Sequence, residues 1–268
     1  MTGELITCTL LCATAFAAGA INALAGGGTL LTFPVLLRVM SPVEANATST
    51  VALMPGSAAG AWGYRRELNG TRSLLLLLIP PSLLGGLVGT LLVVGLPASV
   101  FDFAVPWLLL TASLLFLFQP LFTRIVRTES DKDPEKSAAH SSHVSSRLAV
   151  AAFQFVVAIY GGYFGAGIGI LMLTALAFIG PSDIHRLNAI KTFLAACING
   201  VAVIVFVAEG KVIWRYGLIM AAAGIAGGFC GAHFGRQLPK AAVRWFVVFI
   251  GLVITATQFA KQLGFASP

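Results

Sequence analysis

The sequence is poor in charged residues. Of its 268 residues only 10% are Asp, Glu, Lys or Arg, whereas 57% are hydrophobic and the mean hydropathy is +0.91. A soluble domain carries about 25% charged residues, so this composition excludes one. The apolar runs are about 20 residues long, which suits membrane-spanning helices and not outer-membrane strands. The composition therefore predicts an all-α polytopic protein surrounded by the lipid bilayer.

Residues for covalent or metal chemistry are also scarce. The four cysteines lie inside apolar runs and form no C-x-x-C pair, so neither a disulfide framework nor a metal site is indicated. No catalytic triad, paired carboxylate, H-E-x-x-H motif or P-loop occurs. The glycines of Gly165–Gly169 resemble a nucleotide loop, but they follow a membrane run. We expect no enzyme, no cofactor and no bound metal.

Most basic residues lie in the gaps between apolar runs. The net charge is +7, but this distribution is the orientation signal of a membrane protein, so no nucleic-acid partner is predicted. No Lys or Arg precedes the first run, which favours a first membrane helix over a cleaved signal peptide.

The polar residues divide the chain into three parts. Residues 1–122 are predicted to form a first membrane repeat, residues 123–147 a polar, Ser-rich linker, and residues 148–268 a second membrane repeat. Each repeat is expected to hold four long helices and one short helix after a glycine break. This gives about five segments per half and roughly 8–10 membrane segments in total.

The two halves match at an offset of 142 residues over about sixty residues, which indicates a duplication. Asn46 falls on Asn188, Thr50 on Thr192, and the Gly85-Gly86-x-x-Gly89 motif on Gly227-Gly228-x-x-Gly231. The glycine triplet at 26–28 matches 165–169 only after a slip of one to three residues.

The charges of corresponding loops swap between the halves. The loop at 64–72 carries three arginines, whereas its counterpart at 209–215 has one lysine and one arginine. Conversely, the loop at 95–102 has no basic residue and its counterpart at 236–244 has three. Because basic loops are cytoplasmic, the halves are predicted to be inverted-topology repeats, with a cytoplasmic linker and both termini extracytoplasmic.

Glycine clusters interrupt the first run of each half and are candidate substrate sites. A helix that begins near the bilayer midplane presents free N–H groups and the positive end of its dipole, and both attract anions. Thr29 could cap the first short helix. Asn22 either lines the site or bonds the freed backbone. The glycines assigned to the breaks are Gly26, Gly27, Gly28, Gly165 and Gly167.

Glycines can instead allow close helix packing, and we prefer that interpretation for Gly85, Gly86, Gly89 and their repeats.

Lys191 lies within an apolar run and is predicted to supply positive charge to the site. A lysine at the centre of a spanning helix costs about 2.5–3.5 kcal/mol and needs a partner. No Asp or Glu occupies the central part of any run, so we expect the negative charge to belong to a small anionic substrate.

Amides and hydroxyls accompany the lysine and are predicted to bond the substrate. They are Asn188, Thr192 and Asn199 in one segment and Asn46, Thr48, Ser49, Thr50 and Ser57 in its twin. Helical spacing puts most of each set on one face. If the halves are inverted, the two segments are expected to meet near the midplane with one lysine between them. The alternative is that these side chains only bond neighbouring helices, at about 0.6 kcal/mol each.

Paired motifs carry a family resemblance over nearly the whole chain except the linker. They are Asn22–Pro34 (NALAGGGTLLTFP), Ala45–Thr50 with Ala52–Gly56, Tyr64–Leu68 (YRREL), Tyr160–Gly169 (YGGYFGAGIG), Asp183–Lys191 (DIHRLNAIK) and Asn199-Gly200. These motifs resemble the sulfite exporter TauE/SafE-like family of membrane proteins. The resemblance implies transport of sulfite, sulfonates or related organic anions across the bacterial cytoplasmic membrane.

The sequence therefore predicts a multi-pass permease of the bacterial inner membrane that exports a small sulfur-containing or organic anion by alternating access. No ATP-binding domain is recognised, which leaves transport coupled to a proton or sodium ion, driven by the membrane potential, or facilitated. A homo-oligomer is compatible with the sequence. The alternative function is a non-transporting scaffold or sensor with a structural polar core.

Overall fold

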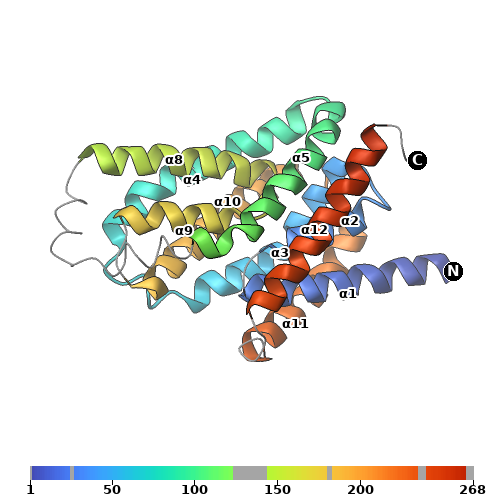
Figure 1. Ribbon diagram of the computed structural model, residues 1–268, viewed down its shortest axis with the longest axis horizontal. Coiled ribbons are helices and arrows are strands. Elements are labelled where there is room, and N and C mark those ends of the chain that lie inside the picture. The colour runs from blue at the N-terminus through green and yellow to red at the C-terminus, as the bar shows by residue number, and fades with distance from the viewer. Residues whose placement is uncertain (1, 25–26, 123–143, 180–182, 235–239, 264–268) are drawn as a thin grey trace.

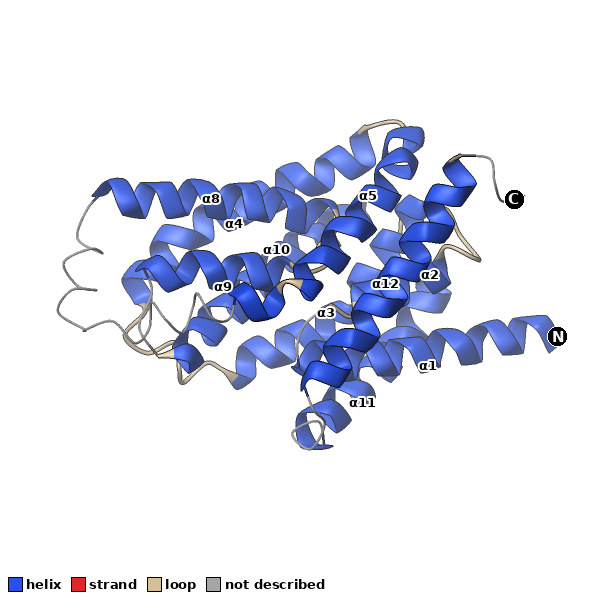
Figure 2. Cartoon of the chain, viewed as in Figure 1, coloured by secondary structure: helices blue, strands red, loops and turns tan. Residues whose placement is uncertain are grey.

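The structure is a computed structural model that describes residues 2–24, 27–122, 144–179, 183–234 and 240–263. Gly26 and most of the predicted linker lie outside these residues. The described residues form ten helices joined by loops, without a strand among them (Figures 1 and 2). In chain order the helices are α1 (Thr2–Leu24), α2 (Thr29–Leu36), α3 (Pro42–Gly63), α4 (Arg72–Gly95), α5 (Ala98–Leu117), α8 (Val144–Tyr163), α9 (Ile168–Ile179), α10 (Ile184–Ala208), α11 (Trp214–Phe234) and α12 (Lys240–Gln262).

The all-α membrane fold predicted from composition is confirmed. Five helices are long and apolar enough to cross a bilayer: α1, α4, α5, α10 and α12. Large apolar side chains such as Trp107, Phe229 and Phe249 are more than half exposed, as expected for surfaces that face lipid. The chain is therefore a multi-pass membrane protein. Helix α8 begins at Val144, so it includes the last four residues of the predicted linker.

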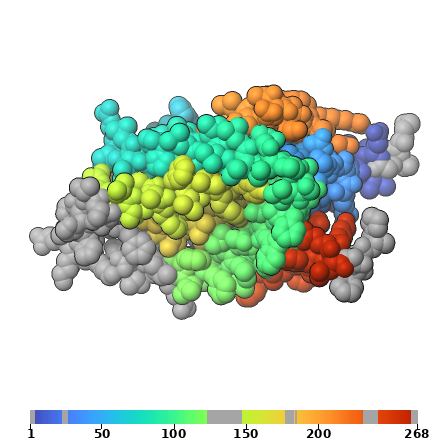
Figure 3. Space-filling view, turned by 90° about the horizontal axis from the view of Figure 1, so that it is seen from above, coloured from blue at the N-terminus to red at the C-terminus, as the bar shows by residue number. Residues whose placement is uncertain are grey.

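Corresponding helices begin at a constant offset along the chain. The first residues of α3 and α10, of α4 and α11, and of α5 and α12 are each 142 positions apart. The packing between the halves shows the same correspondence. α1 packs against α11, and their counterparts α8 and α4 pack against each other. In the space-filling view α4 and α8 lie side by side along one face (Figure 3).

Glycines allow these inter-half helix pairs to approach closely. A Cβ atom on Gly85 would lie 2.5 Å from the carbonyl oxygen of Phe155, and one on Gly89 would overlap the carbonyl oxygen of Ile159. In the matching pair, a Cβ atom on Gly227 would overlap the carbonyl oxygen of Phe16. The packing role preferred for these glycines is therefore confirmed, and it resembles the small-residue contacts of other membrane helices.

Side-chain caps fix where the two central helices begin. Ser41 and Glu44 form a reciprocal capping box at the start of α3, with Pro42 in the first turn. At the start of α10, Asp183 accepts a hydrogen bond of 2.8 Å from the backbone N–H of His185. These caps set the axial position of the polar segments on both helices.

Candidate functional site

Each half contains a helical hairpin whose turn is made by glycine. α1 ends at Leu24 and α2 begins at Thr29, while α8 ends at Tyr163 and α9 begins at Ile168. Gly27 has a φ of +93°, and Gly165 and Gly167 each have a φ of +82°, a conformation that side chains with a Cβ rarely adopt. The two predicted helix breaks are confirmed, although Gly26 lies outside the described residues.

The short helix of the first hairpin folds back along the helix before it. A Cβ atom on Gly28 would lie 2.7 Å from the carbonyl oxygen of Ala18, ten residues earlier. A continuous helix would separate these residues by about 15 Å. The sequence indicated the interruption but not the reversal.

Phe116 of α5 lies between the two hairpin turns. A Cβ atom on Gly27 would overlap its ring, and one on Gly167 would lie 3.7 Å from the same ring and 3.3 Å from Leu115. Phe116 is 1% exposed. The two turns therefore meet on one aromatic side chain. Phe116 was not predicted to have this position, because nothing in the sequence distinguishes it from the other phenylalanines of the apolar runs.

The start of α2 is closed by an amide side chain. Asn22 Oδ1 accepts a hydrogen bond of 2.8 Å from the backbone N–H of Gly28. The expectation that Thr29 caps this helix is wrong, because the cap residue is Gly28 and no side chain of the cap position bonds the helix. Asn22 instead satisfies the freed backbone, which was the second role proposed for it.

The polar segment of the first half is buried and crosses to the second hairpin. Asn46 is 1% exposed, and its Nδ2 donates a hydrogen bond of 3.0 Å to the carbonyl oxygen of Tyr163 at the end of α8. Ser49, which is fully buried, lies 2.6 Å from the hydroxyl of Thr32 on α2. Thr32 was not identified from the sequence, since its partner is seventeen residues away on another helix.

The polar segment of the second half surrounds Lys191. Its Nζ donates a hydrogen bond of 3.2 Å to Asn188 Oδ1, one turn earlier on α10. The methylene chain of Lys191 lies against Gly169 near the start of α9, where an added Cβ would be 3.2 Å from Cδ. Lys191 is half-buried. The ammonium group thus donates to a neutral amide, and Gly169 provides room for the side chain.

The remaining hydroxyls make contacts of the kind expected of structural groups. Thr48 accepts a hydrogen bond of 3.1 Å from the backbone N–H of Ile213 and ties α3 to the start of α11. Thr50 and Ser57 donate to carbonyl oxygens one turn earlier on α3, at 2.8 and 3.3 Å. Asn199 Oδ1 lies near Gly165, 4.0 Å from the position of an added Cβ.

The two polar segments do not meet as expected from the sequence. The methyl group of Thr192 lies 3.4 Å from the position of an added Cβ on Gly60, which is ten residues beyond Thr50 on α3. Ten residues correspond to about 15 Å of helix. Met54 in turn faces Gly200. α3 and α10 therefore run antiparallel, and each polar segment lies against the short helix of its own half.

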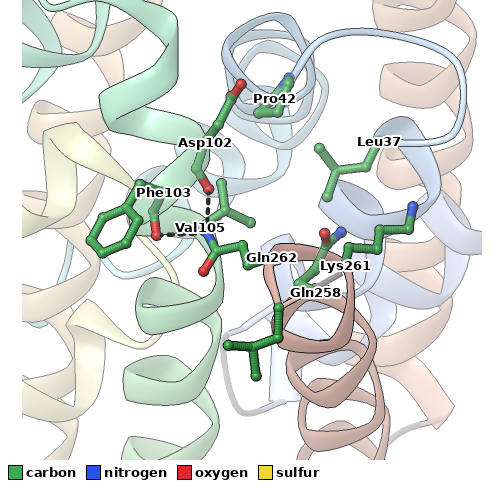
Figure 4. A pocket seen from close by; sticks show the side chains of 9 residues that line it. Leu37, Pro42, Asp102, Phe103, Val105, Gln258, Lys261 and Gln262 are labelled. Carbon is green, nitrogen blue, oxygen red and sulfur yellow. Dashed lines mark hydrogen bonds between the residues drawn. The ribbon is translucent and has the colours of Figure 1, made fainter. Parts of the chain in front are cut away.

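A pocket of about 560 Å³ lies elsewhere, between the start of α5 and the end of α12 (Figure 4). Gln262 Nε2 donates hydrogen bonds of 3.2 and 3.1 Å to the carbonyl oxygens of Asp102 and Phe103 in its wall. Lys261 and Gln258 also line it. None of the predicted site residues lines this pocket. In the described part of the chain, no group of three His, Cys, Asp or Glu residues is placed to hold a metal ion.

The chain is similar to bacterial proteins that are named as transporters. It is 29% identical over 249 residues to a probable membrane transporter protein of Haemophilus influenzae, covering 92% of each chain. It is 28% identical to the probable membrane transporter protein YfcA of Escherichia coli K12, covering 93% of this chain and 87% of the relative. A probable membrane transporter protein of a Sinorhizobium species is 27% identical over 228 residues.

No solved structure matches the chain. The model of the sulfite exporter TauE/SafE family matches residues 11–257, which include both hairpins and both polar segments. These matches support a membrane transporter. The chain belongs to the sulfite exporter TauE/SafE family.

Proposed function

We propose that the protein is a permease that exports a small anion, such as sulfite, an organosulfonate or a related carboxylate, across the bacterial cytoplasmic membrane. The observation that carries the proposal is Lys191 on the membrane-spanning helix α10, whose ammonium group donates to the neutral Asn188. A cation within the bilayer is costly unless an anion accompanies it. A substrate anion would supply the missing charge.

The binding groups on the substrate side are assigned to two regions. Lys191, Asn188 and Thr192 form the cationic region on α10. The hairpin turns at Gly27–Gly28 and Gly165–Gly167 provide the start of each short helix, where the positive end of the helix dipole favours anions. The N–H group of Gly28 is already bonded to Asn22, so the other N–H groups at the start of α2 would serve the anion. Asn199 stands near Gly165 and connects the two regions. The sulfur-containing substrate class rests on the family, whose model is named for sulfite export.

Alternating access would use the matched halves. Figure 1 shows that α1 begins and α12 ends at one end of the molecule, while α8 begins at the opposite end. α1 and its counterpart α8 thus start from opposite ends, which supports inverted repeats. The two hairpin turns share Phe116, so tilting one half against the other would open one turn as it closes the other. The three arginines of the loop at 64–72 support an orientation in which this loop is cytoplasmic and both termini face the outside of the cell.

The experiment is anion transport by the purified protein in proteoliposomes. Labelled sulfite, sulfoacetate and a simple carboxylate are offered to the unmodified protein and to the Lys191→Ala variant, with Lys261→Ala as the control. Lys261 is exposed at the end of α12. Removing a hydrogen bond to a charged group costs about 1.5–3 kcal/mol, so we expect transport efficiency to fall roughly 10- to 100-fold in Lys191→Ala. Lys261→Ala is expected to transport normally.

Two results would contradict the proposal at different levels. If the unmodified protein neither binds nor moves any of the anions, the transporter function is wrong. If Lys191→Ala transports as well as the unmodified protein does, the site is wrong while the function stands.

A further inference from the structure

The side-chain oxygen of Asn46 has a buried lone pair that the protein does not use. Asn46 is 1% exposed and its Nδ2 is bonded to the carbonyl oxygen of Tyr163, which fixes the amide orientation. Its Oδ1 is buried and has no hydrogen-bond partner within the described ranges. Buried polar atoms are almost always paired, so an acceptor in this state indicates a ligand that donates or carries positive charge.

The duplicated half shows what an amide oxygen at this position accepts. Asn188 is the counterpart of Asn46 at the offset of 142 residues, and its Oδ1 accepts a hydrogen bond of 3.2 Å from the ammonium group of Lys191. The counterpart of Lys191 is Ser49. In the second half, the amide oxygen of Asn188 is thus bonded to the cationic side chain of Lys191. In the first half, the corresponding side chain is the short, neutral Ser49.

The groups around Asn46 have the chemistry of a site for a small hard cation. Ser49 lies one turn from Asn46 on α3, on the same face of the helix. Its hydroxyl is 2.6 Å from that of Thr32, and the Thr32 hydroxyl is also 3.3 Å from the carbonyl oxygen of Gly28. When Thr32 donates to Gly28, Ser49 donates to Thr32, so the lone pairs of Ser49 stay available. Ser49 and Thr32 are both fully buried.

The helix α8 adds a favourable field. Asn46 is bonded to Tyr163, the last residue of α8, so its amide stands at the carbonyl end of that helix. This end carries the negative partial charge of the helix dipole. Broken helices of secondary transporters bind coupling cations at such ends.

We infer that Asn46 Oδ1 and the hydroxyls of Ser49 and Thr32 form a binding site for a monovalent cation of sodium size. In the first half, this cation occupies the position that corresponds to the Lys191 ammonium group in the second half. If the proposed anion transport is correct, on which this step rests, the bound sodium provides the second positive charge of a pair and couples anion movement to the sodium gradient.

The first test measures sodium binding without any transported anion. The purified protein in nanodiscs is titrated with NaCl, KCl or choline chloride at constant ionic strength, and bound sodium is followed by radiolabelled sodium and by the unfolding temperature. We expect saturable binding of sodium and stabilisation by sodium that choline does not give. In Asn46→Ala the sodium affinity is expected to fall by at least about tenfold, the equivalent of 1.4 kcal/mol. Asn69→Ala, which removes an exposed amide, is the control and should bind sodium normally.

The second test restores the internal counterpart. In Ser49→Lys the new ammonium can reach Asn46 Oδ1 as Lys191 reaches Asn188, so the folded fraction of this variant should bind no sodium and gain no stability from it. In Lys191→Ser the second half loses its ammonium, and the expected stoichiometry rises from one sodium to two. These variants gain or lose a site, so their readout differs from simple loss of folding.

Three results would overturn the inference. One is an equal response of the unmodified protein to sodium and choline. Another is unchanged sodium affinity in Asn46→Ala. The third combines two observations: the unmodified protein binds no sodium, and Asn46→Ala has a lower anion affinity than the unmodified protein in sodium-free buffer. Asn46 Oδ1 would then accept a hydrogen bond from the substrate. Sodium binding without anion transport would instead leave the site standing and refute the proposed function.

Discussion

Replacing Gly27 by alanine tests whether the hairpin turn and Phe116 are matched to each other. The alanine would be held at a φ of +93°, which costs a residue with a Cβ about 1–2 kcal/mol. Its methyl group would also overlap the Phe116 ring, and overpacking of this kind costs about 1–3 kcal/mol. Together the two terms predict a loss of about 2–5 kcal/mol in the free energy of unfolding.

A second glycine separates the two terms. Gly70 has a φ of +82°, and the nearest atom to an added Cβ is Arg186 Nη1 at 3.9 Å. Gly70→Ala should therefore lose only the conformational term, about 1–2 kcal/mol. Gly56→Ala lies within α3, where an added Cβ meets nothing within 4 Å, and it should be neutral or stabilising by about 0.5–1 kcal/mol.

The assay is reversible unfolding in mixed micelles, with Phe116→Leu completing a double-mutant cycle. Phe116→Leu shortens the ring side chain and should relieve the overlap while leaving the backbone strain. The free energy of unfolding of the double variant is expected to exceed, by about 1–3 kcal/mol, the value obtained by adding the two single losses. Two results would refute the contact between the turn and Phe116. One is that the losses in free energy of unfolding of Gly27→Ala and Phe116→Leu add to within about 0.5 kcal/mol, and the other is that Gly27→Ala and Gly70→Ala lose the same free energy of unfolding.

Two further predictions concern contacts between the halves. Thr48→Val leaves the backbone N–H of Ile213 without its acceptor and should lower the free energy of unfolding by about 1–3 kcal/mol. Thr50→Val removes only a hydrogen bond within α3 and should lower it by less than about 1 kcal/mol. Unfolding in micelles compares the two variants, and equal losses would contradict the hydrogen bond between α3 and the start of α11. Gly89→Leu would force α4 away from α8 and should sharply reduce the yield of folded protein, whereas Gly95→Leu, at the end of α4 where an added Cβ meets no atom within 4 Å, should not. Size-exclusion profiles of the two variants measure the difference. A normal profile for Gly89→Leu would show that the two helices are not in close contact.

The sequence was sufficient to locate the helices because each signal is local. Apolar runs and glycine breaks depend on neighbouring residues, and the short helices α2 and α9 follow the predicted glycine breaks. The reversal at Gly28 was not predictable, since a glycine break is compatible both with a helix that continues and with one that folds back. Thr32 and Phe116 were missed because their partners are distant in sequence.

The separation of the two polar segments has a geometric cause. When two equivalent helices run antiparallel, only residues near their crossing point lie beside their own counterparts. The contacts of Thr192 with Gly60 and of Gly200 with Met54 place that crossing near Pro55. Asn46 and Asn188 lie well before it on their helices, so duplication alone could not bring them together.

The pairing of α1 with α11 also affects how the protein is made. The surface of α1 that carries Gly19 fits the backbone of Gly224, but α11 is synthesised about two hundred residues later. At roughly 5–20 residues per second, a ribosome needs about 10–40 s to reach it. During that interval α1 stays in the membrane without its final neighbour. α1 therefore reaches its final packing only after α11 has been synthesised, and until then the surface that carries Gly19 is open to other partners in the membrane.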